Sequence, residues 1–210
     1  MKGDYLRLVV CFVAVLAFGV ADFVYADAGC CLASAFGRGI KATAVGVNKT
    51  LGSSAIGCNG GTKSSSLATA DIPGLLSTGV VETSASGTPT STSSHARVDN
   101  ILVTAGGNII TATQIISDAQ ASCSGNATGS STIQNLSING DPVNITGEPN
   151  QTVPIPGGKI IINAQKVTTS NGGCVKNITV TALRISLLGI ADVSFATSQA
   201  GVACVTFSCS

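Results

Sequence analysis

Apolar and polar residues alternate along several short segments of this chain, as they do in β-strands that bury one face. Ile178, Val180 and Ala182 share one face of such a segment, and Val193 and Phe195 share one face of another. The pattern predicts strands at residues 41–47, 79–85, 95–103, 109–121, 133–138, 159–167, 175–185 and 191–205.

Glycine, serine, asparagine and proline separate these segments. The plainest predicted loops are 58–66 (CNGGTKSSS) and 87–94 (GTPTSTSS), because both are rich in small polar residues. Segment 109–120 also fits a helix, but its threonine and isoleucine content favours a strand. The predicted fold class is therefore all-β, an antiparallel β-sandwich, with jelly-roll-like and Ig-like topologies both left open.

The first 26 residues have the three-part pattern of a secretory signal peptide. Lys2 and Arg7 precede a 14-residue apolar run, and a cleavage site follows at Ala26. The run is shorter than the about 20 residues that a membrane-spanning helix needs. We expect a signal-peptide helix at 1–26, an N-terminal segment at 27–39 that serves as a tether or donor strand, and one sandwich domain at 40–210. The expected location is extracellular, secreted or at the cell surface, with membrane contact only through the signal peptide.

Composition narrows the partners and the core. The net charge is +1 and only 10% of residues are charged, which argues against nucleic acid as a partner. After residue 26 the chain has no tryptophan or tyrosine and only three phenylalanines, so its core must be aliphatic.

Cysteine usage agrees with export, because dispersed cysteines in an oxidising compartment form disulfides. None of the cysteines forms a CxxC pair, so we do not expect a structural zinc site. The number of cysteines after residue 26 is odd, and the adjacent pair near the new N-terminus is the expected source of the extra thiol. The disulfide candidates are Cys30, Cys31, Cys58, Cys123, Cys174, Cys204 and Cys209.

Candidate chemistry is sparse, and we predict no catalytic, cofactor-binding or metal-binding residue. The single histidine, His95, would need a serine and an acid such as Asp99 to form a hydrolase triad, and the sequence has no GxSxG motif. No spacing singles out a pair of carboxylates for glycoside hydrolysis. Asn139, Asp141 and Glu148 offer oxygen ligands for calcium in one loop, but they lack an EF-hand spacing.

Two further features concern the surface. The chain has six N-glycosylation sequons, of which Asn177 is the doubtful acceptor because it lies inside a predicted strand. The remaining candidates for glycosylation are Asn48, Asn126, Asn135, Asn144 and Asn150.

The segment 139–165 contains four prolines, which cannot donate ladder hydrogen bonds, and we expect it to cross a sheet edge or link the two sheets.

Several segments, in their order, resemble the choice-of-anchor P family of exported bacterial proteins. They are KATAVGV at 41–47, SSHARVDNILVTAGGNIITATQIISDAQASC ending at Cys123, INGDPV, PNQTVPIPGGKIIINAQ, and ITVTALRISLLGIADVSFATSQAGVAC ending at Cys204. The resemblance implies an extracellular domain whose relatives differ in their C-terminal anchoring signal. The residues after Cys204, VTFSCS, contain no such signal, which favours free secretion or retention by assembly.

These observations favour a non-catalytic extracellular structural protein, a subunit of a surface layer, matrix or filament. We expect self-association or binding to other cell-surface proteins, through donation of a strand around residues 28–36 and through Cys30 or Cys31. The alternative is an adhesin or carbohydrate-binding module that uses polar residues at 139–150, with glycans as partners. The scarcity of aromatic residues counts against that alternative.

Overall fold

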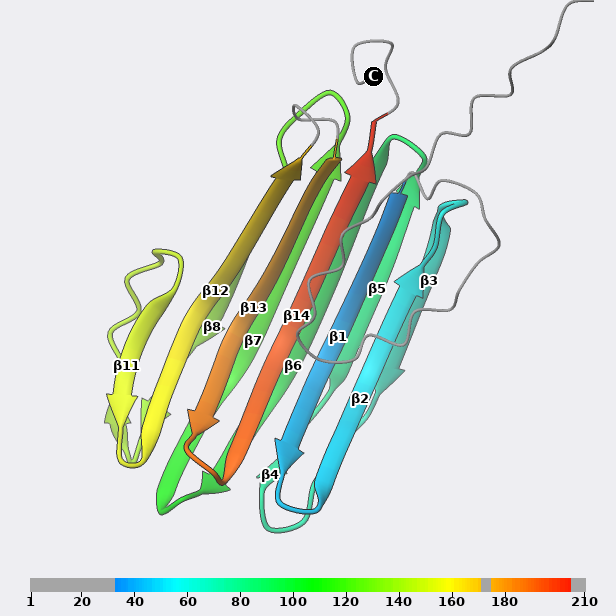
Figure 1. The fold of residues 1–210 in the computed structure, drawn as a ribbon. Helices are drawn as coiled ribbons and strands as arrows, with labels where there is room; N and C mark the ends of the chain where they lie inside the picture. Colours follow the sequence, from blue (N-terminus) through cyan, green and yellow to red (C-terminus); the bar gives the residue numbers. More distant parts are fainter. Residues whose placement is uncertain (1–32, 171–174, 205–210) are drawn as a thin grey trace, which may run out of the picture. The chain divides into compact units, whose positions relative to one another are not determined.

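The computed structural model describes residues 33–170 and 175–204, which fold into two antiparallel β-sheets packed face to face (Figure 1). The described residues contain no helix. The predicted all-β sandwich is therefore confirmed, and the predicted signal-peptide helix lies outside the described residues. The six-stranded sheet has the order β11 (Gln151–Ile155), β12 (Gly158–Ser170), β13 (Val175–Leu187), β14 (Ala191–Ala203), β1 (Ala33–Ala44) and β2 (Val47–Ile56).

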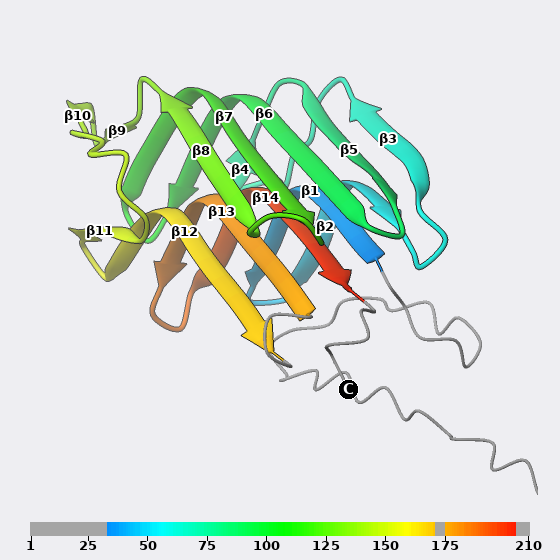
Figure 2. The same ribbon diagram turned by 90° about the horizontal axis from the view of Figure 1, so that it is seen from above.

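The second sheet has eight strands and lies behind the first (Figure 2). Within residues 33–170 and 175–204 the chain crosses between the sheets only after β2 and after β10, so each sheet is largely a meander. The second crossing is the proline-rich segment, as its sequence predicts. The order is β10 (Asp141–Pro142), β9 (Ser137–Ile138), β7 (Asn108–Ser122), β6 (Ser91–Ala105), β5 (Val81–Thr88) and β3 (Gly61–Leu67), with β4 (Leu76–Ser77) paired to β6 and β8 (Thr128–Gln134) paired to β7.

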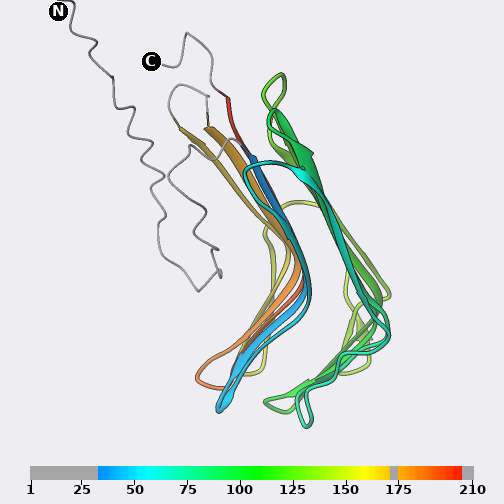
Figure 3. The same cartoon turned by 90° about the vertical axis from the view of Figure 1, so that its right-hand side faces the viewer.

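Both sheets bend sharply near the middle of their strands and in the same direction (Figure 3). The bend coincides with a row of residues in the left-handed backbone region. In the six-stranded sheet these are Gly52 (φ 66°), Ala196 (φ 48°) and Asn163 (φ 53°), on alternate strands. In the other sheet they are Asn100 (φ 50°) and Asn135 (φ 53°). Glycine and asparagine tolerate this region best, so their positions in the sequence place the bend.

The bend shifts the alternation of buried and exposed side chains by one residue. Ala182 and Leu183 are consecutive, yet both are 0% exposed and face the other sheet. On β6, the inward residues Val98 and Ile101 are separated by three positions rather than two. Because each long strand shifts at the same row, the pairing register is the same on both sides of the bend.

The bend divides the sandwich into two halves with different fillings. The aliphatic half contains β1 residues 40–44 and β14 residues 191–195, and the small-residue half contains β1 residues 33–38 and β14 residues 197–203. Fully buried side chains of the aliphatic half include Phe195, Ile40, Ile110, Ile160, Leu183 and Ile185. Inward positions of the small-residue half are mostly small: Ala33, Ala35, Gly37, Ala85, Thr92, Ser94, Ser117, Ala119 and Ser198.

The two sheets lie closer together in the small-residue half (Figure 3). Packed sheets are usually about 10 Å apart because two layers of side chains separate them. Here the hydroxyl of Ser94 on β6 donates directly to the backbone oxygen of Gln199 on β14, at 2.8 Å. A Cβ atom on Gly37 would lie 2.5 Å from the backbone oxygen of His95. A single small side chain therefore spans the gap.

Three expectations about segment boundaries need correction. The sandwich begins at Ala33, inside the segment expected to precede it, because β1 pairs from there with β14. The predicted loop 58–66 contains most of β3, and the predicted loop 87–94 contains the end of β5 and the start of β6. β3 is a mostly exposed strand that forms by pairing with β5. At the start of β6, Thr92 and Ser94 are buried and donate to backbone oxygens of β14, so small residues fit the narrow gap there.

Candidate functional site

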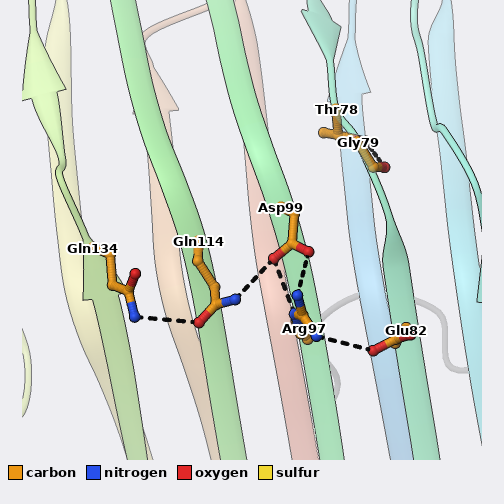
Figure 4. Close-up of polar contacts among 7 residues, drawn as sticks. All are labelled: Thr78, Gly79, Glu82, Arg97, Asp99, Gln114 and Gln134. Atoms are coloured by element: carbon orange, nitrogen blue, oxygen red, sulfur yellow. Dashed lines mark hydrogen bonds and ion pairs between the residues drawn. The ribbon is translucent and has the colours of Figure 1, made fainter.

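A network of charged and amide side chains crosses four strands on the outer face of the eight-stranded sheet (Figure 4). Arg97 donates to Asp99 through Nε at 3.0 Å and Nη2 at 2.6 Å, and its Nη1 lies 3.5 Å from Glu82 Oε2. Gln114 donates to Asp99 at 3.1 Å, and Gln134 donates to Gln114 at 3.3 Å. The hydrogen bond with Asp99 raises the pKa of Arg97 above its ordinary value, against an opposing effect of burial.

His95 belongs to the same outer face and pairs with Asp118, not with Asp99. Nδ1 of His95 lies 2.8 Å from Oδ1 of Asp118, and the two side chains are 39% and 46% exposed. Ser84 is the residue opposite His95 on β5, but no hydrogen bond joins them in the described structure. A serine, a histidine and an acid thus lie side by side on an open face, without the nucleophile–base hydrogen bond of a triad.

The outer face of the six-stranded sheet carries mostly cations. Arg184 donates to Asp192 through Nε and Nη2, at 3.1 and 2.8 Å from Oδ2, and this bond raises the pKa of Arg184. Side chains alternate between the two faces of a strand, so the buried residues show which of their neighbours point outward. The other charged strand residues of this face are identified in this way. They are Arg38, Lys41, Lys159 and Lys166.

Arg38 is the unusual member of this set. It is half-buried, its Nε is buried without a hydrogen-bond partner, and its guanidinium lies 5.5 Å from the ring centre of Phe36. Burial lowers the pKa of Arg38 from its ordinary value. Sequence analysis missed this residue because it treated 27–39 as a segment outside the fold. Alternation through residues 33–37 is the signal that would have placed it on a strand.

The loop 139–150 is the segment that the alternative function, glycan binding, would use, and its own polar side chains bond it to neighbouring strands. Asn139 Oδ1 accepts from the Ile109 backbone at 2.8 Å, and Asn150 Oδ1 accepts from the Gln165 backbone at 3.1 Å. The loop borders a shallow hollow of about 450 Å³, lined by Asn139, Asp141, Asn144, three prolines and aliphatic residues. Glu148 does not line it. Within the described residues, no three histidine, cysteine or acidic side chains gather as a metal site.

A disulfide closes the end of the small-residue half. Cys123 follows β7 and Cys204 follows β14, so their bond joins the two sheets, with Cα atoms 5.4 Å apart. Cys58 is also disulfide-bonded. The other candidates, Cys30, Cys31, Cys174 and Cys209, lie outside the described residues.

The sequon asparagines differ in exposure. Asn177 lies on β13, is half-buried and has a buried Oδ1 without a partner. The five favoured candidates are all exposed: Asn48, Asn126, Asn135, Asn144 and Asn150.

Comparison of the chain with family models, with curated proteins and with solved structures found no match. The resemblance to the choice-of-anchor P family therefore stays a prediction. No helix with the length and hydropathy of a membrane span occurs in the described part of the chain.

Proposed function

We propose that the protein is a secreted, non-catalytic structural subunit that assembles with itself, or with other surface proteins, outside the cell. The observation that carries this proposal is the state of the ionisable side chains on the outer faces. They lie on open sheet faces and most pair with one another, as His95 does with Asp118 and Arg184 with Asp192. Such pairs belong to a surface rather than to a converging reaction centre.

The disulfide between Cys123 and Cys204 supports export, since such bonds persist in oxidising compartments. The leader pattern of residues 1–26 points the same way. Residues 28–36 cannot all be donated to a neighbour, because Ala33 and Ala35 already pair with Val202 and Ile56 within the same molecule. Only residues before Ala33 remain for donation to a neighbour.

Sedimentation velocity of the secreted protein, over a range of concentrations with and without reductant, tests the proposal. We expect species larger than one chain that grow with concentration. Loss of these species on reduction would assign the joint to an intermolecular disulfide. A single monomeric species under all conditions, with every thiol paired within the chain, would overturn the proposal.

The hollow beside the loop 139–150 favours the second candidate, a carbohydrate-binding surface module. Asn139, Asp141 and Asn144 line it together with proline rings, which offer apolar contact in the absence of aromatic residues. A glycan array read with the wild type and an Asp141→Ala variant tests this function. Competable binding that the variant loses would establish it, and no binding above background would reject it.

We also propose that the exposed sequons carry N-glycans in a source that performs this modification. Intact-mass spectrometry before and after enzymatic deglycosylation tests this. We expect a mass loss that maps to one or more of the five exposed asparagines. Glycan on Asn177 alone would contradict the assignment, because that side chain is half-buried.

A further inference from the structure

The bend gives the two outer faces of the sandwich complementary shapes. Both sheets bend in the same direction, so the outer face of the six-stranded sheet is concave and that of the eight-stranded sheet is convex (Figure 3). The two faces therefore have the same sense of curvature. The convex face of one molecule has the form needed to enter the concave face of another.

The two faces also carry opposite charge at their strand positions. On the concave face, five cationic side chains accompany one carboxylate, Asp192, which gives a net charge of +4. On the convex face, three carboxylates accompany one cation, Arg97, which gives −2 with His95 neutral. The convex carboxylates are Glu82, Asp99 and Asp118.

Arg38 adds an independent reason to expect an anionic partner at the concave face. Arg38 pairs with Thr197 on β14 and with Ser53 on β2, and these three residues lie directly beside the bend. Its Nε is buried, yet it has no acceptor. A buried polar group without a partner is destabilising, and a carboxylate from a docked molecule would remove that penalty.

We propose that the convex face of one molecule docks into the concave face of a second copy, so that molecules stack in one orientation through shape and charge. This inference rests on the proposed structural function and names the surfaces that assemble. Each molecule keeps one face of each kind free after docking. Such a heterologous contact does not close on itself unless a rotation forms a ring, so it produces an open stack.

Charge reversal on one face at a time tests the proposal. The variant Lys41→Glu/Lys159→Glu/Lys166→Glu changes the concave face from +4 to −2, and Glu82→Lys/Asp118→Lys changes the convex face from −2 to +2. We expect each variant alone to need roughly tenfold more protein, or more, before it assembles, because like charges then meet across the contact. An equimolar mixture should assemble again, because the acidic concave face of one variant accepts the basic convex face of the other.

A control for the concave variant replaces lysines by glutamates away from both faces. Lys49 and Lys63 are exposed and each pairs with a buried alanine, so neither points to an outer face. The variant Lys49→Glu/Lys63→Glu should assemble as the wild type does. Thermal unfolding followed by circular dichroism checks that all variants fold, and assembly is measured by sedimentation in low and high salt.

The outcomes separate this inference from the function on which it rests. If the wild type assembles and both face variants assemble equally well, the stacking contact is wrong but the structural function stands. If the single variants fail and the mixture also fails, charge pairing between these faces is rejected. If the wild type stays monomeric and only an added acidic polymer binds the concave face, both the self-stacking and the structural proposal are overturned.

Discussion

The two halves of the sandwich show two different ways of holding a pair of sheets together. In the aliphatic half, large side chains such as Phe195 and Ile40 fill a wide gap, and burial of apolar surface stabilises the contact. In the small-residue half the gap is narrow, hydroxyls donate across it, and the Cys123–Cys204 disulfide closes the end. The two halves should therefore respond to opposite substitutions. Smaller residues should destabilise the aliphatic half, and larger residues should destabilise the small-residue half.

The largest effect is expected from Phe195→Ala, which removes the largest fully buried side chain of the aliphatic half. Phe195 is 0% exposed, so its loss should lower the free energy of unfolding by about 3–5 kcal/mol. Phe36→Ala is the matched control, because Phe36 lies on the outer face and contacts Arg38. Urea unfolding of both variants makes the comparison, and equal losses would contradict the described core.

The reverse change in the small-residue half is Gly37→Ala. The added Cβ would lie 2.5 Å from the backbone oxygen of His95 and 3.0 Å from that of Ser84, and the backbone of a packed sheet cannot easily move. We expect a loss of about 1–3 kcal/mol in unfolding free energy. Gly57→Ala, where nothing lies within 4 Å, should be close to neutral. If the two variants melt together, the sheets are not as close as described.

A smaller effect is expected where hydroxyls join the sheets. Ser198 Oγ lies 2.8 Å from Ser117 Oγ and donates to the Ser117 backbone oxygen at 2.9 Å. Ser198→Ala should cost about 1–2 kcal/mol, since it leaves the buried Ser117 hydroxyl without its partner. Adding Ser117→Ala should cost less than the sum of the single changes. Strict additivity in this double-mutant cycle would show that the two hydroxyls do not interact.

The smallest effect concerns the bend between the halves. Asn100 is exposed and has φ 50°, a conformation that costs a β-branched residue about 1–2 kcal/mol. Asn100→Val should therefore lower the melting temperature, whereas Asn100→Gly should change it little. A valine variant as stable as the glycine variant would mean that the chain is not left-handed there.

The sequence predicts the aliphatic half better than the small-residue half, for a physical reason. Alternation identifies Val193 and Phe195 as one buried face of the aliphatic half, and both are 0% exposed. It does not anticipate that Leu183 is buried as well, because a strict period of two has no place for the bend. Strands made of serine, threonine and glycine resemble loops in composition, and contacts distant in the sequence explain them: β3 pairs with β5, and Ser94 of β6 donates to β14.

Site prediction has a similar limit. The sequence identifies His95 and Asp99 as residues able to do chemistry. Their partners on β7, Asp118 for His95 and Gln114 for Asp99, depend on which strands pair. The position of Arg38 on the outer face of the six-stranded sheet depends on β1 starting at Ala33, whereas the first predicted strand begins at residue 41. Strand register, set by contacts distant in the sequence, decides what each polar side chain meets.

Electron microscopy of the native secreted material tests most directly whether the protein is an assembling structural subunit. The account predicts long stacks with one repeating particle, in which every sandwich has the same orientation along the axis. Isolated particles of single-chain size, in material that has not been reduced or diluted, would contradict it.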